Sequence, residues 1–212
     1  MIAALLLTLQ HTIAPPTLMA ESAATAPAAK AVAVLPFEVA QAVNISARQT
    51  LSATDKRDLA AHYSDVARQL LEDRVVGMRG IRVVERSRLD AVLAELNLSK
   101  TGLIRADTAA QVGRALGARY ILLGSFLDIV VSEGHGDIGG SPIQTTRVTS
   151  TVRVRLVETE RAEVVGSWSA SGDHTELQGF TREVLLDWAV PVITDALDRM
   201  QGDGSFEREL TE

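Results

Sequence analysis

Residues 81–127, IRVVERSRLDAVLAELNLSKTGLIRADTAAQVGRALGARYILLGSFL, predict a strand, two helices and a second strand. Residues 81–84 are rich in β-branched side chains, which suit a pleated, half-buried strand. The segment that follows has apolar residues at helical spacing, and the Ser87 hydroxyl is expected to cap its first turn. The apolar positions of this first helix are Leu89, Val92, Leu93 and Leu96.

The second helix of this stretch is expected to begin at Asp107, whose side chain can accept a hydrogen bond as an N-cap. It is expected to end at Gly117, because the left-handed residue that closes a helix is usually glycine. Residues 120–123, YILL, are apolar on both faces of a strand, which predicts a central position in a sheet. The stretch is therefore a packed α/β unit, and it holds no assembled catalytic motif.

The chain before this stretch predicts one more strand and one more helix. Residues 31–37, AVAVLPF, have the composition of a buried strand, which Pro36 closes because proline cannot continue a ladder. A helix is expected to start at Ser52 or Thr54 and to bury one apolar stripe. The stripe is Leu59, Tyr63, Val66 and Leu70, and the positions expected to face outward are Asp58, Asp65, Arg68 and Glu72.

Past Ser125 the pattern changes to antiparallel β-structure. Residues 147–156, RVTSTVRVRL, alternate between polar and apolar side chains, and residues 163–170 return after a polar turn. A helical region over residues 181–200 follows, and Pro191 is expected to kink it or split it in two, since proline lacks the amide hydrogen.

The expected fold class is α/β: a single domain over residues 30–201, with a mixed β-sheet flanked by about four helices and an added antiparallel hairpin. Residues 202–212 are polar and acidic, and they are expected to be a disordered tail. Residues 1–29 hold a short apolar run and an Ala/Pro-rich linker, which resemble a secretory signal with cleavage after Ala20 or Ala24. A disordered Ala/Pro-rich tail is the alternative for this segment.

The composition excludes several classes of function. The 21 basic and 27 acidic residues leave a net charge of −6, which disfavours nucleic acid as a partner because phosphate binding needs clustered Lys and Arg. The sequence has no cysteine, so a thiolate metal site, a cysteine nucleophile and a Cys-linked lipid anchor are excluded for it as it stands. Its apolar runs all fall short of the ~18 residues of a membrane-spanning helix.

Residues 134–139, GHGDIG, match the G-x-G-x-x-G pattern of dinucleotide-binding proteins. That mechanism needs a helix N-terminus directly after the glycines, whereas a β-type pattern follows here. These residues are therefore expected to form the tip of a hairpin that contacts a partner, and no cofactor is expected. The predicted contact residues are Gly134, His135, Gly136, Asp137, Gly139 and Gly140.

No catalytic, cofactor-binding or metal site is expected in the sequence. The four histidines lack the spacing of a helical metal pair, and His135 with Asp137 offers only two ligands. No serine lies in a G-x-S-x-G elbow, and Trp168 is expected to pack against the core. A basic stripe is expected to pair with acidic residues across the strands; the residues are Arg147, Arg153, Arg155, Glu158, Glu160 and Glu163.

Three blocks of the sequence together resemble the CsgG family, the family of the curli secretion component of the bacterial outer membrane and of HfaB-like proteins. They are AVAVLPF at residues 31–37, the block from VVERSRLDAVLAE to ALGARYILLGSF at residues 83–126, and VRVRLVETERAEVVGSWSASG at residues 152–172. The resemblance implies a periplasmic α/β domain, export through a signal and, for pore-forming members, a ring of subunits.

The function that the resemblance implies is non-enzymatic. It is an exported protein, in the periplasm or at the periplasmic face of the outer membrane, that acts in secretion or surface assembly through protein–protein contacts as a homo-oligomer. Pore-forming members contribute two long hairpins per subunit; residues 126–131 and 144–156 can supply one, whereas the chain between Gly172 and Glu183 is too short for a second. The alternatives are a soluble periplasmic module like the lipoprotein activators of peptidoglycan synthases and, third, an enzyme.

Overall fold

The computed structural model describes residues 29–39, 43–45, 52–96, 105–177, 181–202 and 204–211, which form one mixed seven-stranded sheet and six helices. Residues 1–28 of the predicted signal segment lie outside the described residues. The strands are β1 (Lys30–Val34), β2 (Glu38–Val39), β3 (Val43–Ile45), β4 (Ile81–Val83), β5 (Tyr120–Ile138), β6 (Ser141–Glu158) and β7 (Glu163–Glu176). The helices are α1 (Ala53–Val76), α2 (Arg86–Glu95), α3 (Ala106–Leu116), α4 (Arg182–Asp187), α5 (Ala189–Gln201) and α6 (Ser205–Thr211). The predicted α/β class with a mixed sheet and an antiparallel hairpin is confirmed.

The sheet has a parallel part and an antiparallel part that meet at β5. Its order is β4-β1-β5-β6-β7; β1 runs parallel to both β4 and β5, while β5, β6 and β7 are antiparallel neighbours. The short strands β2 and β3 continue along β5 beyond the end of β1. The predicted strand YILL begins β5, where Ile121 and Leu122 are fully buried, as its apolar faces require.

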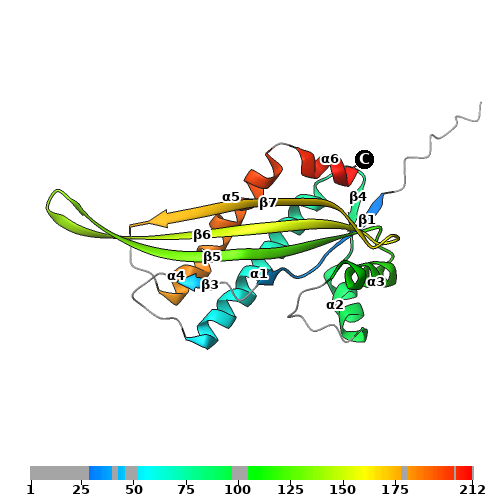
Figure 1. The fold of residues 1–212 in the computed structure, drawn as a ribbon, viewed down its shortest axis with the longest axis horizontal. Coiled ribbons are helices and arrows are strands. Elements are labelled where there is room, and N and C mark those ends of the chain that lie inside the picture. Colours follow the sequence, from blue (N-terminus) through cyan, green and yellow to red (C-terminus); the bar gives the residue numbers. More distant parts are fainter. Residues whose placement is uncertain are drawn as a thin grey trace, which may run out of the picture.

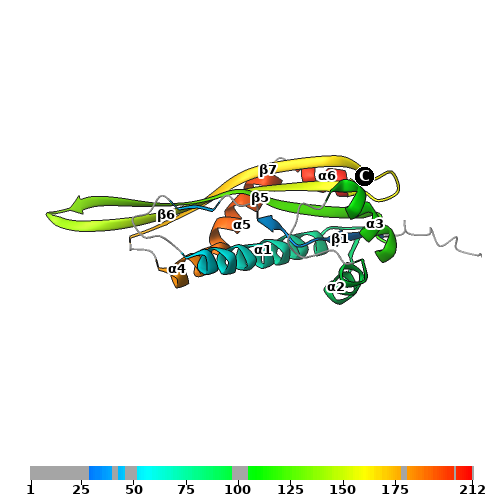
Figure 2. The ribbon, with the colours of Figure 1, turned by 60° about the horizontal axis from the view of Figure 1, so that its bottom comes forward.

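The helices cover the two faces of the sheet unequally (Figures 1 and 2). α1 and α5 lie along one face, over the main core cluster of Tyr63, Phe126 and Val192. α2 and α3 lie against the opposite face, where Leu89 of α2 and Ile121 of β5 belong to a second cluster that extends from β1 to β6. The rest of that second face carries no helix among the residues that the structure describes.

Helix α1 has Ser52, one of its two predicted starts, as its N-cap, and a capping box forms there. The Ser52 hydroxyl accepts a hydrogen bond from the Asp55 amide at 3.1 Å, and the Asp55 carboxylate accepts one from the Ser52 amide at 3.2 Å. The hydrogen bond from the Ser52 hydroxyl holds the pKa of Asp55 below its usual value. The prediction that Arg68 faces outward is wrong: its side chain is buried, because Glu72 one turn later accepts its Nη1 hydrogen bond at 2.7 Å.

Helices α2 and α3 each begin earlier than predicted. Their N-caps are Glu85 and Arg105, neither with a side-chain capping bond, so the caps predicted at Ser87 and Asp107 are wrong. The helical hydrogen bonds already start at the carbonyls of these earlier residues, and Asp107 instead lies in the first turn, where the helix dipole favours an acid. The predicted left-handed closure at Gly117 is confirmed by its φ of 66°.

The C-terminal region holds more helix than predicted. The expected split near Pro191 is confirmed, since α4 ends at Asp187 and α5 begins at Ala189. The prediction of a disordered tail is wrong for α6, which buries Phe206 and Leu210. These two apolar residues lie four positions apart, so a single helical turn presents both to the core. The split and this extra helix raise the number of helices from about four to six.

Trp168 packs against this C-terminal helix. Its ring lies edge-to-face on Phe206 at a centroid distance of 5.0 Å, and its Nε1 donates a hydrogen bond to the Ser205 hydroxyl at 2.9 Å. Gly166, two residues earlier on the same face of β7, leaves room for the indole ring, which a Cβ there would contact. Trp168 is thus a packing residue, as predicted.

Candidate functional site: the β5–β6 hairpin

The hairpin formed by β5 and β6 reaches beyond the helices at one end of the domain (Figure 1). Its outermost pair is Ile138 with Ser141, so only Gly139 and Gly140 form the turn. Their φ angles of 63° and 85° favour glycine and match the twist of a hairpin. The Asp137 carboxylate accepts a hydrogen bond from the Gly140 amide at 2.7 Å and closes the turn. The predicted hairpin is confirmed, and its role in partner contact stays a prediction.

The predicted contact residues fall into two groups, because most of them are strand rather than loop. Gly134 and Gly136 alternate along one face of the ribbon, as the period of two in a strand requires. A Cβ at Gly134 would lie 2.5 Å from the hydroxyl oxygen of its cross-strand partner Thr145, so the Thr145 side chain occupies the space that glycine leaves on this face. The strand β5 contains Gly134, His135, Gly136 and Asp137, and the turn contains Gly139 and Gly140.

The outer part of the hairpin has no third strand beside it among the described residues. β3 accompanies β5 only as far as Val131, and β7 accompanies β6 only as far as Thr146. Residues 134–145, which we call the hairpin tip, are therefore a two-stranded ribbon with two free edges. Because such a ribbon alone is marginally stable in water, a surface that packs against the tip would stabilise it.

A β-bulge lies where the hairpin leaves the core. The register of β5 on β6 shifts between Phe126 and Asp128, and the extra residue, Leu127, is exposed. The Asp128 carboxylate accepts a hydrogen bond from the Thr151 amide at 2.9 Å, and the Ser150 hydroxyl donates to the Asp128 carbonyl oxygen at 3.4 Å. The Asp128 side chain therefore provides an acceptor for the Thr151 amide beside the bulge.

Replacing Asp128 with alanine is expected to lower the free energy of unfolding by about 1–2 kcal/mol, because the Thr151 amide loses its acceptor in a half-buried position. Asparagine at this position keeps an oxygen acceptor and is expected to restore most of the loss. Urea denaturation of the three proteins measures the difference. Equal losses for alanine and asparagine would show that the carboxylate acts through its charge and not through this hydrogen bond.

The face of β6 and β7 that points away from α1 and α5, which we call the open face, is polar. The predicted pairing of its arginines with the acidic residues near the β6–β7 turn is wrong. The register places Arg153 opposite Ser169 and Arg155 opposite Ser167, while Arg161 of the turn pairs with Glu158 instead. The open face consists of Arg147, Thr149, Thr151, Arg153 and Arg155 on β6 and of Ser167, Ser169, Ser171, Asp173 and Thr175 on β7.

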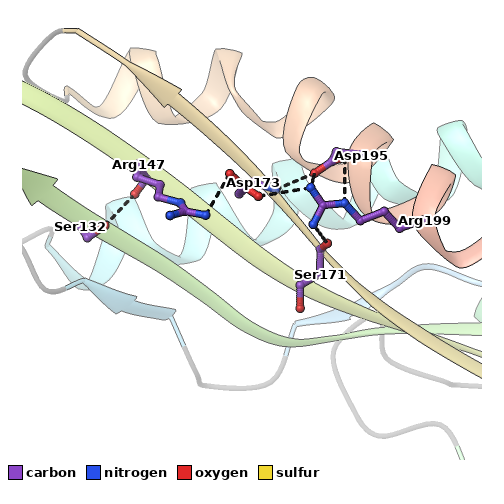
Figure 3. Close-up of polar contacts among 6 residues, drawn as sticks. All are labelled: Ser132, Arg147, Ser171, Asp173, Asp195 and Arg199. Carbon is purple, nitrogen blue, oxygen red and sulfur yellow. Dashed lines mark hydrogen bonds and ion pairs between the residues drawn. The ribbon is translucent and has the colours of Figure 1, made fainter.

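A network of ion pairs joins the open face to helix α5 around the outer edge of β7 (Figure 3). Asp173 pairs with Arg147 of β6 at 3.1 Å and with Arg199 of α5 at 3.4 Å. Arg199 also donates to the Ser171 carbonyl oxygen at 3.1 Å, and the Asp195 carboxylate accepts the Asp173 amide at 3.0 Å. These contacts occupy outward backbone groups of an edge strand, which hinders pairing with another strand there.

Sequence reasoning missed this network. The i,i+4 spacing of Asp195 and Arg199 predicts only a local pair, which the structure contains at 2.8 Å. Their contact with β7 depends on the packing of α5 beside this strand, which spacing does not encode.

A further charged residue, Glu38 of β2, lies near Arg155 of the open face. Burial raises the pKa of Glu38, while the charge of Arg155 opposes this shift.

The three histidines that the structure describes have separate surroundings. His62 Nε2 lies 3.1 Å from the Leu186 carbonyl oxygen, and His174 Nε2 lies 3.0 Å from a Glu176 carboxylate oxygen. His135 is exposed on the hairpin tip, and His11 lies outside the described residues. No three His, Asp or Glu side chains in the described part of the chain are placed to hold a metal ion.

A family model for the curli production assembly/transport component CsgG matches residues 19–182 of the chain. No curated protein matches the sequence. No helix formed by the described residues has the length and hydropathy needed to span a bilayer.

Several solved structures share features of the fold at low identity. The LpoB C-terminal domain from Salmonella enterica is 15% identical, with a TM-score of 0.41 over 73% of this chain and 87% of that chain. The hypothetical protein CT253 from Chlamydia trachomatis is 12% identical, with a TM-score of 0.46 over 87% and 99% of the two chains. PelC from Paraburkholderia phytofirmans, a dodecamer, is 16% identical, with a TM-score of 0.32 over 82% and 88%. The family match, and not these distant likenesses, is the basis for assigning a function.

Proposed function

Because this chain belongs to the CsgG family, we propose that it is an exported, non-enzymatic protein of the cell envelope that works through protein–protein contacts. The family match supports a role in the envelope. The proposed location is the periplasm or the periplasmic face of the outer membrane, and the proposed process is outer-membrane-associated secretion or surface assembly. The proposed partners are envelope proteins and further copies of this chain; no cofactor or nucleic acid takes part.

The observation that carries this proposal is the projecting hairpin tip. Its residues 134–137 are exposed, it has two free edges among the described residues, and it extends beyond the helices of its own domain (Figure 1). A ribbon of this kind gains stability when it is held by another surface. The tip therefore supports contact with a partner better than it supports any chemical reaction.

A second candidate function is a periplasmic binding or regulatory module. The short connection between β7 and α4 favours it, because β7 ends at Glu176 and α4 begins at Arg182. No second projecting hairpin occurs in the part of the chain that the structure describes. In this case the tip binds one partner at a time, without a ring of subunits.

The experiment that tests the proposal shortens the hairpin. Deleting Gly134–Asp137 and Pro142–Thr145 removes four cross-strand pairs and keeps both the Gly139–Gly140 turn and the alternation of faces. Chemical crosslinking in envelope fractions is expected to give complexes larger than a monomer for the wild-type protein and to lose them for the shortened protein. The matched control changes Glu160 to alanine in the turn at the opposite end of β6 and is expected to keep the complexes.

The outcomes separate the alternatives. Complexes that contain only this chain, in several copies, support assembly, whereas a single heterologous partner supports the regulatory module. Circular dichroism and the midpoint of urea unfolding must show that the shortened protein still folds. A wild-type protein that stays monomeric in the envelope, or complexes that persist unchanged after the hairpin is shortened, would overturn the proposal.

A further inference from the structure

The turn of the hairpin fixes which backbone groups point away from the ribbon. In a two-residue hairpin loop, the flanking pair, here Ile138 with Ser141, is hydrogen-bonded, and bonded and non-bonded pairs then alternate along the strands. The residues of β5 whose amide and carbonyl groups point outward are therefore Glu133, His135 and Asp137. The same alternation continued into the β6–β7 ladder makes Thr149 with Asp173 a non-bonded pair. The Asp173 amide accordingly points away from β6 and donates to Asp195.

The two edges of the tip differ in what they offer to a new strand. On β6 the outward positions are Pro142 and Gln144, and proline has no amide hydrogen, so this edge is weakened for pairing. On the outer edge of β7, farther from the tip, side chains of α5 occupy the outward groups of Ser171 and Asp173. The β5 edge, by contrast, has three successive outward positions, each with a free backbone amide and a free backbone carbonyl group. It has no strand partner among the described residues.

The charge of this edge selects the partner. The outward residues include Glu133 and Asp137. In the described part of the chain their carboxylates accept hydrogen bonds from neutral groups alone, the Gln144 side-chain amide at 3.2 Å and the Gly140 backbone amide at 2.7 Å. No ion pair of either carboxylate occurs among the described residues. Side chains of an added strand lie beside those of the edge strand and on the same face, so opposite charges at alternate positions are favourable.

We propose that the β5 edge of the hairpin tip, at Glu133, His135 and Asp137, binds an extended basic polypeptide segment as an added β-strand. Backbone hydrogen bonds supply the affinity, and lysine or arginine at alternate positions faces the two carboxylates. Gly134 and Gly136 carry no side chains of their own on the other face, where the Thr145 and Ile143 side chains of β6 lie beside them, so β5 presents its side chains on one face only along this edge. This inference rests on the proposed function and names the class of partner that the tip recognises.

Proline scanning of two directly paired residues tests the proposal on the full chain. His135 and Gln144 face each other across the ribbon, and the amide of each points outward on opposite edges. His135→Pro removes a donor from the β5 edge, whereas Gln144→Pro makes the same change on the β6 edge, where Pro142 shows that proline is tolerated. Because the Gln144 side chain also donates to the Glu133 carboxylate, Gln144→Ala is the reference for Gln144→Pro. The probe is a fluorescein-labelled peptide, KTKVKTK, with ETEVETE as its charge-reversed control, and fluorescence anisotropy measures binding.

The expected result is that Gln144→Pro binds KTKVKTK as Gln144→Ala does, while His135→Pro binds it roughly tenfold more weakly than the wild-type protein. ETEVETE is expected to bind more weakly than KTKVKTK, and hydrogen exchange is expected to slow at the amides of Glu133, His135 and Asp137 in the complex. Equal binding by the two proline variants, equal binding of the two peptides, or protection on β7 instead would overturn the proposal.

Two further outcomes identify what failed. If sedimentation shows that the wild-type protein self-associates, that His135→Pro is a monomer and that no peptide binds, the edge serves a second copy and the peptide proposal is wrong. If envelope complexes are lost on shortening the hairpin but persist in His135→Pro, strand addition alone fails and the proposed function stands.

Discussion

Replacing Phe126 with alanine is expected to lower the free energy of unfolding by about 3–5 kcal/mol, the usual cost of emptying a buried aromatic site. The Phe126 ring is only 1% exposed. It contacts Phe37 at a centroid distance of 5.8 Å and Tyr63 of α1 at 6.0 Å. The Tyr63 hydroxyl in turn donates a hydrogen bond to the Leu185 carbonyl oxygen at 3.1 Å, so the ring joins the sheet to two helices.

The adjacent residue provides the control for this prediction. Leu127 is the extra residue of the bulge and is 37% exposed, so Leu127→Ala is expected to change the free energy of unfolding by only about 0.5 kcal/mol. Urea denaturation followed by tryptophan fluorescence measures both variants. If the two substitutions cost the same, the bulge does not separate core from surface at this point and the register of β5 on β6 is wrong.

The second large effect is expected at Gly172, where β7 meets α5. A Cβ on this residue would contact the Val192 carbonyl oxygen and would lie 2.5 Å from the Ala196 amide nitrogen. Both are backbone atoms of a helix, which cannot move aside as a side chain can. We therefore expect Gly172→Ala to cost about 3 kcal/mol, the upper part of the usual range for overpacking.

Ser169 provides the matched position on the same strand, because its side chain lies on the open face. Ser169→Ala is expected to leave the free energy of unfolding within about 0.5 kcal/mol of the wild-type value. Thermal unfolding followed by circular dichroism compares the two variants. A Gly172→Ala protein as stable as Ser169→Ala would mean that α5 does not approach β7 as closely as the structure has it.

The local signals in the sequence predicted the parts of the fold that local physics controls. Alternation and apolar runs predicted β1, β5 and β6, Ser52 was one of the two predicted starts of α1, and Gly117 predicted the end of α3. The failures concern long-range contacts. Arg68 is buried because it forms an ion pair with Glu72 inside the packed domain. Helix α6 is held in place because Phe206 packs against Trp168, some forty positions earlier in the sequence.

The candidate site was likewise predictable in its local features and not in those that depend on long-range packing. The glycines of residues 134–140 predicted a hairpin tip, because the positive φ angles of a tight turn favour glycine. They did not predict which edge stays open for a partner. That depends on the two-residue turn, which fixes which amides point outward, and on Asp195 and Arg199, which lie against β7 only after α5 has packed.

The first and last elements of the domain meet at the end opposite the hairpin tip. The Lys30 ammonium donates a hydrogen bond to the Leu210 carbonyl oxygen, which joins the start of β1 to α6, and Figure 1 shows both far from the tip. The start of β1 therefore lies at one pole of an elongated body, and the hairpin tip lies at the other (Figure 1). If the tip binds a partner as proposed, the length of the domain sets how far from the start of β1 that partner is held.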